Sequence, residues 1–150
     1  MSEIADGKIK RKRKSRVSAT SARENLVLGE LLRRGFDAQL GPKEHEVFVR
    51  AGDSPPRTIQ VKAAHSPPWY VRSASLLGKN ADHVTVLVLL GVERNPKSAR
   101  FFVAKNSDLA ARFRQTPSWK VIREPSNRKA YGYIDFSSVE KYEDSWDILK

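Results

Sequence analysis

The chain has 150 residues, enough for one domain with its own core, and its 28 Lys and Arg residues against 17 acidic ones give a net charge of +11. This charge indicates a polyanionic partner, most simply nucleic acid. The lack of cysteine excludes disulfides and thiol chemistry, and no apolar run reaches the roughly 18–20 residues of a transmembrane helix. With a polar start that is not typical of a secretory signal, we expect a cytoplasmic protein with no membrane attachment and no small-molecule cofactor.

Residues 1–18 are expected to form a disordered basic tail. They contain too few large apolar residues for a core, and their positive charges repel one another. On DNA or RNA such a tail would neutralise phosphates and add affinity that depends on salt but not on sequence. The basic residues of the tail are Lys8, Lys10, Arg11, Lys12, Arg13, Lys14 and Arg16. A single globular domain is then expected over residues 19–150.

A helix is predicted over residues 21–34, where leucines recur at intervals of three and four residues. Ser21 and Glu24 have the spacing of a capping box, and Gly35 is suited to end the helix. Glu24 therefore has two interpretations that are compatible with each other. It is either a structural cap of the helix or a carboxylate that the first turn presents to a metal.

Three short strands should follow the helix, at residues 36–40, 46–50 and 57–64, and form an antiparallel meander. Residues that favour turns separate them. Glu46 stands at the start of the second strand, on the face opposite the valines that follow it.

The third predicted strand, residues 57–64, alternates between polar and apolar side chains in its middle, from residue 58 to residue 63. Ile59 and Val61 would point one way, and Gln60 and Lys62 the other, with about 6–7 Å between these two polar residues. A half-buried edge strand with an outward lysine would have the same pattern. The interpretation therefore depends on the carboxylates that precede the strand.

Two prolines at positions 67 and 68 should end that strand. Trp69 follows them, and it suits either a core position or a contact with the bases or sugars of a nucleic acid. The next residues are ambiguous, with a short helix expected around residues 75–77.

An apolar run at residues 84–90 predicts a strand buried on both faces, at the centre of a sheet that helices cover. A strand at residues 100–104 should pair with it. Asn106-Ser107-Asp108 is a typical start of a helix.

Near the C-terminus, Trp146 and Leu149 are expected to dock onto the body of the domain. The other elements predicted there are a strand at 119–122, a loop at 124–129, an edge strand at 131–136 and a helix opened by a second capping box, Ser137-Ser138-Val139-Glu140.

One helix, three strands and a buried central strand together describe an α/β sandwich. The hairpin between the second and third strands can bring Glu46 beside Gln60. Two side-chain oxygens and a nearby backbone carbonyl would suit a hard divalent cation. Lys62 would stand beside the cation, where it could orient or deprotonate a metal-bound water and stabilise charge on a phosphate.

The set Glu24, Glu46 and Gln60-Val61-Lys62 resembles the PD-(D/E)XK nuclease superfamily, which has the restriction-endonuclease-like fold. More narrowly, the chain is similar to a group of small bacterial proteins of that superfamily with an Ile-Gln-Val-Lys strand. The likeness covers about residues 20–149. The matching segments are Glu24 to Arg33-Arg34-Gly35-Phe36, Ile59-Gln60-Val61-Lys62, Trp69 and Tyr142-Glu143-Asp144-Ser145-Trp146-Asp147-Ile148-Leu149.

The resemblance implies an αβββαβ core with a mixed central sheet flanked by helices. It gives Glu46 the place of the family's first Asp and Gln60 that of the acid before the lysine, which is Lys62. Glu24 becomes the acid on the helix. It also implies Mg²⁺ or Mn²⁺ held by Glu46, Gln60 and Glu24, DNA as the substrate, and a homodimer as an assembly that cuts both strands.

Two departures from the family pattern bear on whether the site is catalytically active. Glu46 is one methylene longer than Asp, and Gln60 removes one negative charge from the site. The first hypothesis is an Mg²⁺-dependent, endonuclease-like DNA phosphodiesterase. The alternatives are a catalytically weak or inactive DNA-binding module on the same fold, and a basic scaffold for protein interactions whose carboxylates are caps and surface charges.

Overall fold

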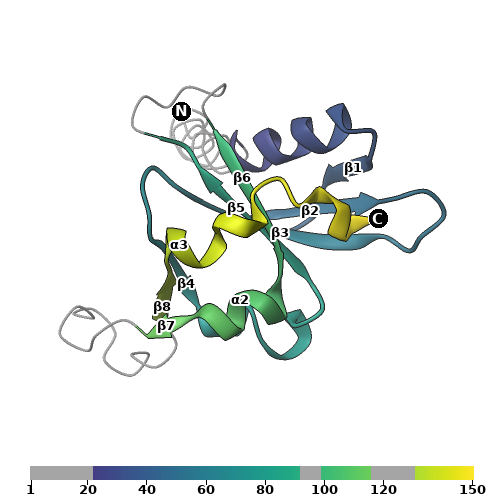
Figure 1. The fold of residues 1–150 in the computed structure, drawn as a ribbon. Helices are drawn as coiled ribbons and strands as arrows, with labels where there is room; N and C mark the ends of the chain where they lie inside the picture. Colours follow the sequence, from purple (N-terminus) through teal and green to yellow (C-terminus); the bar gives the residue numbers. More distant parts are fainter. Residues whose placement is uncertain (1–21, 92–98, 116–130) are drawn as a thin grey trace, which may run out of the picture.

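Two sheets organise the structure, a computed structural model that describes residues 22–91, 99–115 and 131–150 (Figure 1). The main sheet has five strands in the order β1-β2-β3-β5-β6, and the small sheet has three in the order β4-β8-β7. The strands are β1 Asp37–Leu40, β2 Glu46–Arg50, β3 Arg57–Ala64, β4 Trp69–Arg72, β5 Val84–Leu89, β6 Arg100–Lys105, β7 Arg114–Gln115 and β8 Tyr131–Ile134.

Helices are few and short in the described residues. The longest, called the first helix here, covers residues 22–33. None of the described helices is long and apolar enough to cross a membrane. The others are α2 Asn106–Arg112, α3 Phe136–Val139 and the 3-10 turns Ser73–Ser75, Gly78–Asn80, Glu140–Tyr142 and Trp146–Leu149.

The main sheet is mixed, as predicted. Strands β1, β2 and β3 form the expected antiparallel meander, and β5 then pairs in parallel with β3, with Ile59 beside Val84. The crossover between these two strands holds β4 and two 3-10 turns in place of the short helix predicted around residues 75–77. Five consecutive buried residues in β5 confirm a strand buried on both faces. It is an interior strand of the sheet, but the middle of the five is β3, so the prediction that this strand lies at the centre is wrong.

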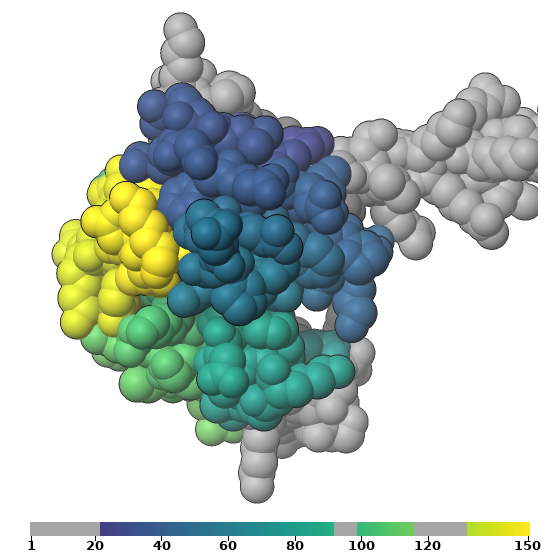
Figure 2. Space-filling model, turned by 90° about the vertical axis from the view of Figure 1, so that its right-hand side faces the viewer, coloured from purple at the N-terminus to yellow at the C-terminus, as the bar shows by residue number. Residues whose placement is uncertain are grey.

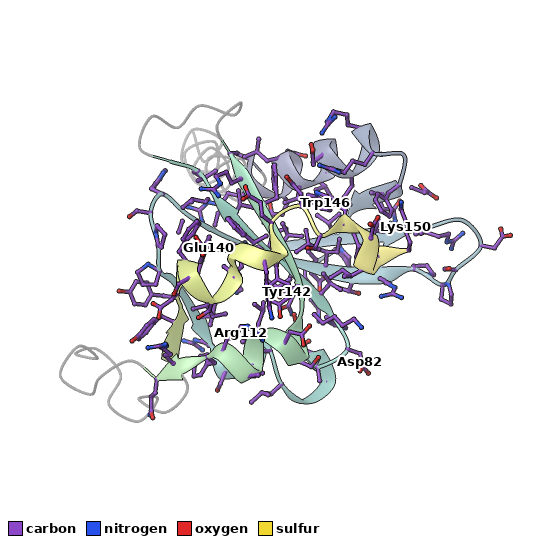
Figure 3. All side chains as sticks on the ribbon, viewed as in Figure 1. Asp82, Arg112, Glu140, Tyr142, Trp146 and Lys150 are labelled. Atoms are coloured by element: carbon purple, nitrogen blue, oxygen red, sulfur yellow. The ribbon has the colours of Figure 1, made fainter. Side chains whose placement is uncertain are left out.

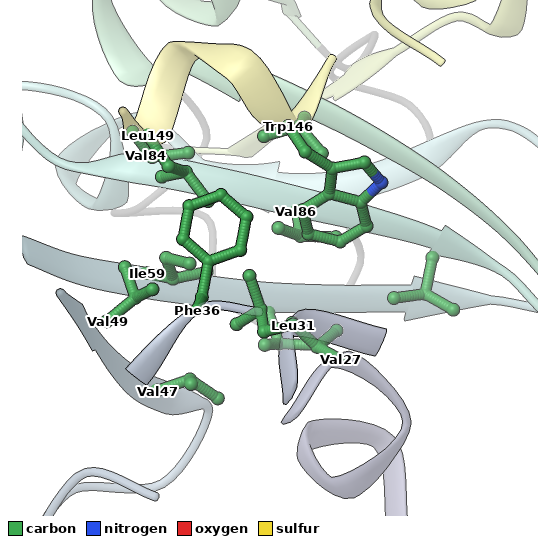
Figure 4. Packing of buried hydrophobic residues seen from close by; sticks show 13 residues of the cluster. Val27, Leu31, Phe36, Val47, Val49, Ile59, Val84, Val86, Trp146 and Leu149 are labelled. Atoms are coloured by element: carbon green, nitrogen blue, oxygen red, sulfur yellow. The ribbon is translucent and has the colours of Figure 1, made fainter. Parts of the chain in front are cut away.

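One face of the main sheet packs against the first helix (Figures 1 and 4). Val27 and Leu31 of the helix lie over Val47 of β2 and Ile59 of β3, and all four side chains are fully buried. The C-terminal turn completes this core with Trp146 and Leu149, which confirms that the terminus docks onto the body. Figure 2 shows this yellow segment lying against the blue N-terminal part of the domain.

The other face of the main sheet carries a second core, formed with α2 and the small sheet. Trp69 stands in it with 1% of its surface exposed, donates from Nε1 to the carbonyl oxygen of Val88 at 3.1 Å, and meets the Phe102 ring edge-on at 5.5 Å. The expectation that Trp69 contacts nucleic acid is therefore wrong. Its indole has become a core group because β4 turns it toward the sheet.

Two polar side chains of helix α2 bond to other elements: Asn106 to β5 and the two 3-10 turns of the crossover, and Arg112 to α3. Asn106 is fully buried, accepts from Thr85 Oγ1 at 2.6 Å, and donates to the carbonyl oxygens of Ser75 and Asn80. Arg112 donates to Ser138 O and lies over the Tyr142 ring (Figure 3). Helix α2 begins at Asn106, which confirms the helix start predicted at Asn106-Ser107-Asp108.

Two further predictions near the C-terminus are corrected. Strand β8 is the middle strand of the small sheet, not an edge, because β4 and β7 pair with its two sides. Helix α3 is one turn long, begins after Asp135 and has no side-chain cap, so the second capping box does not form. The predicted strand at 119–122, the loop at 124–129 and the basic tail lie outside the described residues.

Candidate active site

Strands β2 and β3 bring two of the predicted site residues together. Glu46 and Gln60 are directly paired across the antiparallel ladder, so their side chains lie on the same face, with Cβ atoms about 4.5–5.5 Å apart in such a pair. Lys62 follows on the same face of β3. This face is opposite the first core, because Val47, the neighbour of Glu46, is buried in that core. The hairpin geometry expected from the sequence is thus present.

Gly41 makes room for Glu46 at the end of β1. The backbone N–H of Gly41 donates to the carbonyl oxygen of Glu46 at 2.9 Å. A Cβ atom at Gly41 would lie 2.7 Å from the Glu46 Cβ, closer than two carbon atoms can approach. The start of β2 is therefore fixed against the preceding turn, and with it the root of the Glu46 side chain.

Gln60 carries a polar atom that the described structure leaves without a partner. Its Oε1 is buried and accepts no hydrogen bond from any described residue. Leaving a buried acceptor unpaired costs about 1–3 kcal/mol, and such atoms are uncommon in folded proteins. An amide oxygen in this state is a suitable ligand for a hard cation. This atom is the observation that best fits a metal beside Glu46.

Lys62 stands half-buried beside Leu87, its partner in the parallel ladder with β5, and Leu87 is fully buried. Burial lowers the pKa of Lys62, and the nearby guanidinium of Arg72 lowers it further. A lysine with a lowered pKa releases its proton more easily than a solvated one. The sequence alone did not single out Arg72, which follows Trp69 and Tyr70 on β4.

Glu24 makes contacts with His45 that the sequence did not indicate. Only 4% of Glu24 is exposed, and its Oε1 accepts from the backbone N–H of His45 at 2.7 Å. The same oxygen lies 3.2 Å from Nδ1 of His45. Its predicted capping partner, Ser21, lies outside the described residues. Glu24 therefore joins the first helix to the residue that precedes Glu46.

His45 connects this carboxylate to the third strand. Its carbonyl oxygen accepts from the N–H of Val61, the residue between Gln60 and Lys62, at 2.8 Å. Its backbone has φ 65°, a left-handed conformation that is uncommon outside glycine and in which His, like Asn and Asp, is enriched. Glu24, His45 and Val61 thus form a chain of contacts, called the Glu24 clamp here, that runs from the first helix to β3.

A metal at this site would have few charged ligands. Within the described ranges, no three residues among His, Cys, Asp and Glu gather closely enough to hold a metal ion. Glu24 and Glu46 do not converge with a third such group, so the three-ligand set of Glu24, Glu46 and Gln60 stays a prediction. The pair that the geometry does bring together is Glu46 and Gln60.

The order of the strands, with a mixed five-stranded sheet and flanking helices, defines a restriction-endonuclease-like fold. Among solved structures, the chain is similar to Hjc, a Holliday junction resolvase from the archaeal hyperthermophile Archaeoglobus fulgidus, with a TM-score of 0.56. The two sequences are 14% identical, and the likeness covers 87% of this chain and 95% of that one. At this identity, the comparison shows a shared fold. No family model matches the sequence, and neither does any curated protein.

Proposed function

We propose that this protein is a metal-dependent DNA phosphodiesterase whose active site is formed by Glu46, Gln60 and Lys62. The observation that carries the proposal is the pairing of Glu46 with Gln60, whose buried Oε1 has no partner in the described structure. The fold shared with a Holliday junction resolvase supports this chemistry, and the net charge of +11 supports DNA as the partner. The tail at residues 1–18 would add phosphate contacts, and residues 19–150 would form the nuclease domain.

Glu46 and Gln60 would hold Mg²⁺ or Mn²⁺ through a carboxylate and an amide oxygen. A metal bound there would supply an acidified water and neutralise charge on the phosphate. Lys62, on the same face as both ligands, would hold that water in line and accept or return a proton. Its pKa, lowered by burial and by Arg72, brings this exchange closer to neutral pH than it is for a solvated lysine. A homodimer would set two such sites against the two strands of a duplex.

The proposal is tested by cleavage of duplex, single-stranded and branched DNA in the presence of Mg²⁺ or Mn²⁺. Glu46→Ala, Gln60→Ala and Lys62→Ala should each slow cleavage by about 100-fold or more, the usual effect of removing a group that acts on the transition state. Glu44→Ala is a matched control, because Glu44 is exposed and lies two residues from Glu46. Cleavage that survives all three substitutions would refute the proposal.

A second function is favoured by one observation. Gln60 is neutral where the nuclease pattern has an acid, so a cation in this site would meet one carboxylate on the two paired strands. The alternative is a DNA-binding module with weak or no catalysis. Tight binding that falls steeply with salt and does not respond to Mg²⁺ or Mn²⁺ would identify it.

A further inference from the structure

The small sheet has one buried face and one outer face. Along β4, Trp69 and Val71 are buried in the second core, while Tyr70 and Arg72 point the other way and are exposed. The Tyr70 side chain is 63% exposed, the largest fraction among the exposed large hydrophobic residues of the described structure. The sheet therefore presents an aromatic ring and a guanidinium to the outside from the same strand.

A row of side chains crosses all three strands of this outer face. Tyr70 of β4 pairs directly with Tyr133 of β8, and Tyr133 pairs in turn with Arg114 of β7. Directly paired residues share a face, and the two tyrosine rings have centroids 6.4 Å apart with a tilt of 58°. Asp135 Oδ2 lies 3.2 Å from Nε of Arg114, whose side chain is still 62% exposed.

Aromatic rings and guanidinium groups on one face of a sheet can bind single-stranded nucleic acid, because the rings stack on bases and the guanidinium groups contact phosphates. An unpaired base exposes both of its π faces, whereas a base in a duplex is covered by its neighbours, so only the unpaired base can stack on a tyrosine. Arginine contributes phosphate contacts and can itself stack on a base. The combination therefore favours an unpaired strand over a duplex.

This face also adjoins the candidate active site. The guanidinium of Arg72 is close enough to Lys62 to lower the pKa of the lysine. Strand β4 follows β3 in the sequence after a short connection. Tyr70 and Arg72 therefore come shortly after Gln60 and Lys62 along the chain. A strand of DNA held on the small sheet would thus lead toward Lys62.

We propose that the outer face of the small sheet binds an unpaired segment of the DNA substrate, with bases stacked on Tyr70 and Tyr133 and phosphates held by Arg72 and Arg114. The choice of DNA rests on the proposed function, whereas the preference for unpaired bases rests on the exposed Tyr70 ring and the half-buried Tyr133 ring beside it. The face would make a substrate that joins single-stranded and duplex segments a better ligand than an uninterrupted duplex.

The test is fluorescence anisotropy of the full chain with a labelled oligo(dT) of about 20 nucleotides and with a duplex of the same length, in EDTA and at a salt concentration near 0.15 M. Tyr70→Ala and Tyr133→Ala should each weaken binding of the single strand by about 5- to 150-fold, the range that corresponds to 1–3 kcal/mol for one stacked base. Affinity for the duplex should change by less than about two-fold.

Conservative and distant substitutions provide the controls. Tyr70→Phe and Tyr133→Phe keep the ring and should bind the single strand as the wild type does. Leu32→Ala removes another exposed hydrophobic residue, on the first helix, and should leave both affinities unchanged. Melting temperatures of the alanine variants show whether they are folded.

Three results would overturn the proposal. They are unchanged binding of the single strand by both alanine variants, an equal loss for single strand and duplex, and a loss that the phenylalanine variants share. Because binding is measured without metal, a protein that fails to cleave DNA can still pass this test. A nuclease that lacks the unpaired-strand site would fail it while cleaving normally.

Discussion

Lys62 is the residue at which function and stability oppose each other most clearly. A charged ammonium group half-buried beside Leu87 loses hydration, and Arg72 adds repulsion of like charges. The folded state therefore bears a cost for holding this charge. Such a cost is expected at a site that must present a lysine with a lowered pKa to a substrate.

Replacing Lys62 by Met should therefore stabilise the protein at neutral pH. The folded-state pKa lies below that of the unfolded chain, so at any pH below both values the two states are protonated and the full cost is present. As pH rises through the folded-state pKa, the folded protein releases the proton first and the cost disappears. The urea midpoint of Lys62→Met should exceed that of the wild type at pH 7, by about 0.3 M or more, and this difference should shrink toward pH 10.

The matched control for this experiment is Lys79→Met, which removes an exposed lysine on a 3-10 turn. Its midpoint should follow that of the wild type at both pH values. A Lys62→Met protein that is less stable than the wild type at pH 7, or a difference that grows with pH, would contradict this account of Lys62.

At the level of elements, the Glu24 clamp sets the position of β2 relative to the first helix and β3. Glu24 accepts the N–H of His45, and His45 accepts the N–H of Val61. Glu46 is the next residue after His45. A carboxylate on the helix thus controls where the site begins without needing to touch a metal itself.

Glu24→Ala would leave the buried N–H of His45 without an acceptor, at a cost of about 1–3 kcal/mol in the free energy of unfolding. Glu24→Gln keeps an oxygen in the same place and should recover most of that loss. Urea denaturation measures both. Arg23→Ala is the control on the same helix, because Arg23 is exposed and its removal should change stability by less than about 0.5 kcal/mol.

Equal losses for the alanine and glutamine variants at position 24 would show that the charge of Glu24 matters rather than its role as an acceptor. Retention of stability by both variants would show that the contact with His45 contributes nothing.

Strands with clear alternation could be predicted from the sequence to the residue. Strands β2 and β3 begin and end where expected, because one face of each is buried and the other carries polar groups. Strand β4 was missed, because it is four residues long and follows two prolines. Its partner β8 lies far along the chain, and local patterns do not reveal which strands pair.

Part of the site could be predicted, because it lies on the two strands whose alternation is clear. The pairing of Glu46 with Gln60 follows from hairpin geometry, so the sequence indicates it. The contact between Glu24 and His45 and the influence of Arg72 on Lys62 depend on how elements pack, which no local pattern specifies. Trp69 was ambiguous because an aromatic after a turn suits both a core and a surface, and only its hydrogen bond to Val88 decides.

For the molecule as a whole, the net charge of +11 favours a polyanionic partner, as the proposed function requires. The chain shares its restriction-endonuclease-like fold with a Holliday junction resolvase. The small sheet adds the exposed Tyr70 ring and, next to Lys62, the guanidinium of Arg72. Taken together, the two proposals have the domain hold a DNA backbone across β3 and an unpaired segment over the small sheet.

The central claim is that Glu46 and Gln60 hold a metal beside Lys62, and local oxidative cleavage tests it most directly. Fe²⁺ can replace Mg²⁺ in an oxygen-ligand site, and with ascorbate and peroxide it cuts the polypeptide next to where it is bound. Mass spectrometry of the fragments should locate the cuts in β2 and β3, next to Glu46 and Gln60, and Gln60→Ala should abolish them. Cuts confined to other segments, or cuts that persist in Gln60→Ala, would contradict the assignment.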